Sequence, residues 1–131
     1  MQLSDAVRNA RLDAIESTVG TSAQLKIFSG AVPANCAAAD PSGLLVTMNL
    51  PSDWMAAAAS GSKALLGTWS ATASSGASTA PVTYRIYNSA GSTCHIQGPA
   101  GVGTGELQLN GSITSGQTVT VTAFTIADPN G

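Results

Sequence analysis

The chain has 131 residues, of which 44% are hydrophobic but only 9% are charged, and its formal net charge is −2. This length suits one domain, and the apolar content favours a folded chain over a disordered one. Because the five basic residues form no cluster, neither nucleic acid nor an anionic membrane is expected as a partner.

The N-terminal pattern predicts a helix over residues 4–19. Ser4 followed by Asp5 is a good N-cap with an acid in the first turn, and Gly20 is a suitable C-terminal stop. At about 100° per residue, two apolar stripes lie on different sides of this helix. The first stripe consists of Leu3, Ala6, Val7, Ala10 and Ala14, and the second stripe consists of Leu12, Ile15 and Val19.

A helix that packs on its own domain needs only one apolar stripe, so the second stripe has two interpretations. Either the last turns of the helix bend into the core, or the second stripe meets another subunit, and the sequence leaves both open. Asp5, Asp13 and Glu16 are expected to form a solvated face. We therefore divide the chain into a helical arm, residues 1–20, and a β-domain, residues 21–131.

After Gly20 the hydrophobic period changes to two, which predicts strands. The expected strands cover residues 24–29, 43–50, 64–73, 81–88, 93–97, 106–110 and 117–127, with loops over 30–41, 74–79 and 98–105. In the last strand Val119 and Val121 share one phase, but Phe124 takes the other, so a β-bulge is expected near Ala123.

Two local features interrupt this strand pattern. Ser52 and Gly61 bracket a predicted short helix over residues 53–60, which would dock by its Trp54–Met55 end because two turns are too short to stand alone. Asn110 and Gly111 form a turn signal, although a longer 111–116 connection with Ile113 turned inward is equally open.

Seven short strands separated by turns predict a mainly β fold, namely an antiparallel β-sandwich or jelly-roll with an N-terminal helical arm and one short inserted helix. In the strand over residues 81–88, Tyr84 and Ile86 share the inward face, which leaves Arg85 and Tyr87 outward. The expected core comprises Leu25, Ile27, Val46, Met48, Trp69, Tyr84, Ile86, Leu107, Leu109, Val119 and Val121.

The residues offer little for catalysis. The one histidine, His95, directly follows Cys94, and neighbours on a strand point to opposite faces, so they form no Cys–His dyad. Cys36, Cys94 and His95 lack metal-ligand spacing, and no pair of carboxylates is indicated. We therefore expect no enzyme activity, no cofactor and no metal.

The two cysteines allow one disulfide closing a long loop, but the reduced state is expected because the sequence shows no signal peptide that would direct the chain into an oxidising compartment. The N-terminal residues carry no basic segment with an apolar core, and no apolar run approaches ~20 residues. Neither secretion by a signal peptide nor a membrane span is expected.

Three stretches, LSDAVRNARLDAIE (residues 3–16), LPSDWMAAA (50–58) and SGQTVTV (115–121), resemble a group of small proteins encoded among the virion genes of tailed bacteriophages. The resemblance extends over nearly the full chain and brings no catalytic motif with it. It implies a virion component that is assembled in the bacterial host cytoplasm.

For such a component we expect a capsid decoration (cement) protein on the outer head surface, with the major capsid protein and further copies of itself, such as a trimer at a local threefold position, as partners. The alternative is a tail or adsorption component, such as a fibre-base or host-glycan-binding module, which a short chain without repeats favours less. The expected interface residues are Leu3, Val7, Leu12, Ile15, Val19, Trp54 and Met55.

Overall fold

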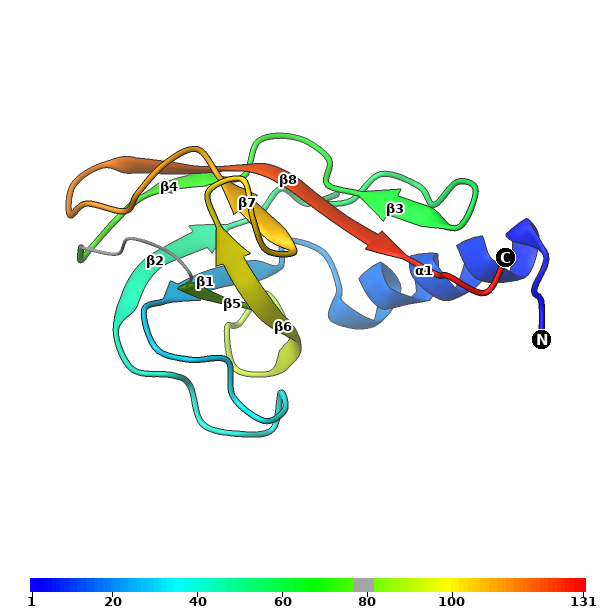
Figure 1. Ribbon diagram of the computed structural model, residues 1–131, viewed down its shortest axis with the longest axis horizontal. Coiled ribbons are helices and arrows are strands. Elements are labelled where there is room, and N and C mark those ends of the chain that lie inside the picture. The colour runs from blue at the N-terminus through cyan, green and yellow to red at the C-terminus, as the bar shows by residue number, and fades with distance from the viewer. Residues whose placement is uncertain (77–81) are drawn as a thin grey trace.

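The computed structural model describes residues 1–76 and 82–131, which form one helix and eight strands (Figure 1). The mainly β fold with an N-terminal helix is therefore confirmed. Residues 77–81, which fall in the expected 74–79 loop and at the start of the expected 81–88 strand, lie outside the described part. The elements are α1 (Asp5–Val19), β1 (Gln24–Phe28), β2 (Leu44–Asn49), β3 (Ser62–Ala64), β4 (Ser70–Thr72), β5 (Val82–Tyr87), β6 (Cys94–Gly101), β7 (Leu107–Leu109) and β8 (Thr118–Ala127).

The strands form one sheet in the order β2-β1-β5-β6-β7-β8-β3, with β4 paired to β8 beside this path. The sheet curls until β4 comes close to β2, so that its inner face surrounds one core (Figure 1). The arrangement differs from a two-sheet antiparallel sandwich in two respects. The strands belong to one hydrogen-bonded sheet, and β6 runs parallel to β7.

All eleven residues expected in the core are buried. Three aromatic rings pack together in this core. The Trp69 ring lies 5.9 Å from that of Trp54 and 5.5 Å from that of Phe124, measured between centroids. Each buried indole N–H has an acceptor, the carbonyl of Gly20 for Trp54 and that of Leu66 for Trp69. The period of two thus predicts the inward face correctly, because successive side chains of a strand point to opposite faces of the sheet.

Two local expectations are confirmed on β8 and in the connection before it. Opposite β8, Gln108 pairs with Ala123 but Leu109 pairs with Val121, so one extra residue bulges out and Phe124 returns to the core. Ile113 is also buried, which selects the longer connection over the two-residue turn.

The expected helix over residues 53–60 is wrong. This segment is extended, with Met55 bridged to Leu65 and Ala59 to Ser62. Its alanines favour helix, but the amide of Ala56 bonds to the Ala64 carbonyl, and α1 supplies further acceptors described below. Two helical turns cannot compete with these tertiary hydrogen bonds.

The strand expected over residues 64–73 is split. Residues 62–64 form β3 and residues 70–72 form β4, with Gly67 at a φ of +74° in the turn between them. Conversely, β6 continues to Gly101 through part of the expected 98–105 loop. No helix in the described part of the chain is long and apolar enough to cross a membrane.

Candidate functional site

The helix α1 begins and ends where its caps predict. The Ser4 hydroxyl accepts the amide of Val7 at 3.4 Å, and Gly20, at a φ of +93°, donates its own amide to the Glu16 carbonyl at 2.9 Å. The helix runs beside β3 and the end of β8 (Figure 1). Its position relative to the sheet determines which of its faces can meet a partner.

The second stripe faces the chain's own interior. Leu12 and Val19 are only 3% and 5% exposed, Val19 joins the main core, and Ile15 is half-buried. Of the two interpretations of this stripe, packing against the chain's own core therefore holds for Leu12 and Val19. Burial of a large apolar side chain stabilises the folded state by about 1.5–3 kcal/mol, and this free energy holds the helix on the sheet.

A buried lysine joins α1 to the segment after β2. Lys63 is 2% exposed, and its Nζ lies 2.7 Å from Asp13 Oδ1, 2.9 Å from Glu16 Oε2 and 2.8 Å from the Ala56 carbonyl oxygen. The hydrogen bond from Lys63 is the largest cause that lowers the pKa of Asp13. Burial opposes the charge on Lys63, but hydrogen bonds to the two carboxylates outweigh it and raise the pKa of Lys63.

The same carboxylates hold the backbone of the segment that was expected to be helical. Asp13 accepts the amide of Ala58 at 3.0 Å, and Glu16 accepts the amide of Met55 at 3.1 Å. The expectation that Asp13 and Glu16 belong to a solvated face holds only in part, because the Asp13 side chain is 48% exposed but that of Glu16 is only 19% exposed, and both carboxylates bind other parts of the chain. They line one wall of an open cleft of about 520 Å³, which also contains Lys63 and Asp53.

The first half of α1 is tied to the C-terminal segment. Arg8 donates to the Asp128 carbonyl at 2.8 and 3.1 Å, and Arg11 Nη1 lies 3.0 Å from Asp128 Oδ2. The amide of Leu3 donates to the Asn130 carbonyl at 2.7 Å. Polar contacts thus fix the helix near both of its ends.

The first stripe is the side of α1 that remains open. Val7 is 46% exposed, and Ala6, Ala10 and Ala14 are exposed beside it, while Leu3 is half-buried. Of the seven expected interface residues, only Leu3, Val7 and Ile15 are accessible. Leu12, Val19, Trp54 and Met55 are interior residues, because the sheet and the 50–65 segment close around them.

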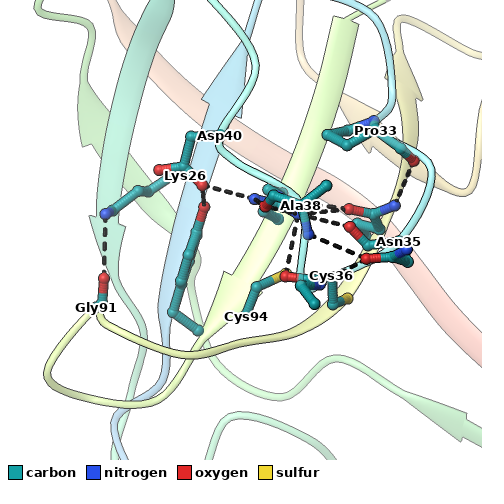
Figure 2. Close-up of polar contacts among 12 residues, drawn as sticks. Lys26, Pro33, Asn35, Cys36, Ala38, Asp40, Gly91 and Cys94 are labelled. Atoms are coloured by element: carbon teal, nitrogen blue, oxygen red, sulfur yellow. Dashed lines mark hydrogen bonds and ion pairs between the residues drawn. The ribbon is translucent and has the colours of Figure 1, made fainter.

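A second cluster of polar contacts surrounds Arg85, on β5. Arg85 is 1% exposed, and it donates to the carbonyls of Asn35, Cys36 and Ala38 at 3.0–3.2 Å (Figure 2). It also bonds to Gln97 Oε1 at 2.9 and 3.0 Å, and its Nη1 lies 2.6 Å from Asp40 Oδ1. This guanidinium fastens the loop over residues 29–43 to the sheet, and we call it the Arg85 clamp.

Arg85 and Tyr87 lie on the face of β5 opposite the core residues Tyr84 and Ile86, as expected, but that face is not open to solvent, because the 29–43 loop covers it. Gln97 on the neighbouring β6 assists by donating to the Pro33 carbonyl at 2.6 Å. One signal was present in the sequence, a single arginine in the otherwise uncharged strand over residues 81–88. A lone arginine in such a strand needs a set of acceptors, which the loop supplies.

Tyr87 extends the clamp. Its hydroxyl donates to Asp40, and Lys26 Nζ lies 4.4 Å from its ring centroid while donating to the Gly91 carbonyl (Figure 2). Burial opposes the charge on Asp40, but the hydrogen bonds from Tyr87 and Arg85 outweigh it and lower the pKa of that carboxyl. The pKa of Tyr87 is raised, first by burial and then by its hydrogen bond to Asp40.

We expect the two tyrosines to resist ionisation until the protein unfolds in alkali. Burial, and then the hydrogen bond to Glu106, raises the pKa of Tyr84, as burial and Asp40 do for Tyr87. Since unfolded phenols titrate near pH ~10, this stabilisation is complete below about pH 10 and is lost as the pH rises further. Tyrosinate absorbance followed together with circular dichroism should show one joint transition. Tyrosinate formation with unchanged circular dichroism would contradict it.

Both cysteines are free; burial, and then the neighbouring Cys36, raises the pKa of the Cys94 thiol, which also donates to the Ile96 carbonyl at 3.5 Å. Within the described residues, no three His, Cys, Asp or Glu side chains gather to hold a metal ion.

No family model, curated protein or solved structure matches the chain. The site must therefore be interpreted from its own geometry, which combines an exposed helix stripe with buried charges whose partners lie in the same chain.

Proposed function

We propose that this chain is a non-enzymatic structural protein of a tailed-phage virion that decorates the outer head surface. It binds the major capsid protein there and contacts neighbouring copies of itself. The resemblance of residues 3–16, 50–58 and 115–121 to virion proteins supports the phage context. The observation that carries the role is the exposed first stripe on a helix whose other side is firmly docked.

The first stripe suits a docking surface because it is apolar and held in place. Val7 and the alanines of α1 face outward, while Leu12, Val19 and the Lys63 ion pairs hold the opposite side. A surface that is already ordered loses little conformational entropy on binding. Alanines also let a partner backbone approach closely, so the stripe can meet a flat neighbour.

The buried charges support a structural role rather than a catalytic one. Lys63 is matched by Asp13 and Glu16, Arg85 by Asp40 and loop carbonyls, and Asp128 by Arg11. In the described part of the chain, every buried side-chain nitrogen and oxygen atom has a hydrogen-bond partner. These groups are engaged in holding segments together, which is what a small protein under mechanical load requires.

On a head, each copy would bridge adjacent capsid subunits. Because a ligand that binds only the assembled shell stabilises that shell by mass action, many modest contacts would together oppose the internal pressure of the DNA. Low surface charge fits this use, since the protein works packed among neighbours.

The location of the protein in an imaged virion tests the proposal directly. We expect density in a regular lattice over the head, and heads lacking the protein should release DNA at a lower temperature. Density confined to the tail would overturn decoration and favour the adsorption alternative.

A charge placed on the first stripe should weaken docking without unfolding the protein. For Val7→Asp combined with Ala10→Asp, we expect capsid binding to weaken by at least about tenfold, because unpaired charges would be buried in the interface. Co-sedimentation with capsids lacking the protein measures this. The matched control is Ser112→Asp, in an exposed loop, which should bind normally. Unchanged binding by the helix variant would exclude the first stripe as the anchor.

A further inference from the structure

Two thiols far apart in the sequence meet beside the Arg85 clamp. Cys36 lies in the 29–43 loop, Cys94 is the first residue of β6, and both are half-buried. They line the same surface depression of about 500 Å³, which Arg85 also lines. Figure 2 shows the labelled side chains of Cys36 and Cys94 next to each other, and Cys36 is among the groups that raise the pKa of the Cys94 thiol, after burial.

Backbone contacts hold both cysteines where they are. The Cys36 carbonyl accepts Arg85 Nη2 at 3.2 Å, while Cys94 pairs with Tyr87 of β5 in the sheet. Arg85 and Tyr87 are two residues apart on the same strand, so one element fixes the positions of both cysteines. The sulfur atoms are thus kept together by contacts that do not involve the thiols themselves.

We propose that Cys36 and Cys94 form a redox modification site, at which an oxidising small-molecule disulfide converts the two thiols into an intramolecular bridge. In the first step one protein thiolate attacks the small disulfide, which gives a mixed disulfide and releases one small thiolate. The second protein thiolate then attacks the protein sulfur of that mixed disulfide and expels the other small thiolate. The two protons lost by the protein thiols are taken up by the two released thiolates, so the small disulfide is reduced as the protein is oxidised.

The bridge would connect the 29–43 loop covalently to β6 and enclose β2 to β5 in one loop of the chain. A cross-link over such a separation mainly restricts the unfolded chain, and a loop of this length is near the upper part of the usual stabilising range. We therefore expect the oxidised protein to unfold about 10 °C higher than the reduced protein.

The test uses the purified full chain in glutathione buffers of graded oxidised fraction, without denaturant. After alkylation of free thiols and trypsin digestion, Cys36 lies in the peptide of residues 27–63 and Cys94 in that of residues 86–131. We expect these two peptides to become linked in monomeric protein, with the rise in unfolding temperature. Cys36→Ser and Cys94→Ser should each show neither change under the same oxidant.

Three results would overturn the proposal. One is a stable glutathione adduct on either cysteine in place of the bridge. The second is a disulfide between two copies of the chain, and the third is a bridge that forms only after urea has unfolded the protein.

Discussion

Replacement of Trp69 by alanine is expected to lower the free energy of unfolding by about 3–5 kcal/mol. Trp69 is fully buried, and its ring lies between those of Trp54 and Phe124. The substitution removes contacts to both rings and leaves the Leu66 carbonyl without its indole donor. The loss of stability therefore combines the cost of a cavity with the cost of a buried acceptor that has no donor.

Urea unfolding followed by circular dichroism measures this loss. Thr118→Ala, on the exposed side of β8, is the matched control and should change the free energy of unfolding by no more than about 0.5 kcal/mol. If Trp69→Ala cost as little as the control, Trp69 would not occupy the centre of the core.

The second large effect is expected at the Arg85 clamp. Arg85→Met should lower the free energy of unfolding by about 3 kcal/mol, because three loop carbonyls lose their donor and Asp40 loses its ion pair at the same time. Arg85→Lys should recover only part of this loss, since one ammonium cannot reproduce the fork of the guanidinium. Arg11→Met is the matched control. Arg11 is 55% exposed, and Asp128 keeps its hydrogen bonds from Asn130, so the loss should be no more than about 1 kcal/mol.

A local readout separates loss of the clamp from general destabilisation. The 29–43 loop in Arg85→Met should be cut by a protease of broad specificity under conditions in which the rest of the chain is resistant. Equal protection of this loop in Arg85→Met and in Arg11→Met would contradict its attachment through Arg85.

Features that depend on neighbouring residues were predictable from the sequence. Ser4 and Gly20 bracket α1 as expected, because capping needs only atoms within one turn. The alternation of Val119 and Val121 and its interruption before Phe124 located the bulge on β8. The core residues followed from the same period, since the pleat of a strand decides which side chains share a face.

Features that depend on residues far apart in the sequence could not be predicted from the sequence. The 53–60 segment reads as a helix locally, but Asp13 and Glu16 hold its amides in an extended form. Arg85 reads as an outward residue, but a loop that begins more than forty residues earlier in the chain covers it. In both cases the competing hydrogen bonds come from groups whose proximity no local pattern reveals.

The sequence by itself thus determined the mainly β class, the limits of the N-terminal helix and the inward face of most strands, because these follow from propensity, capping and period. Only the tertiary structure decided the rest. It buries Leu12 and Val19 and leaves the first stripe around Val7 open, because a helix with two apolar stripes can cover only one of them on its own sheet. It also brings Cys36 beside Cys94, because the curled sheet and the Arg85 clamp fold a loop back onto β6.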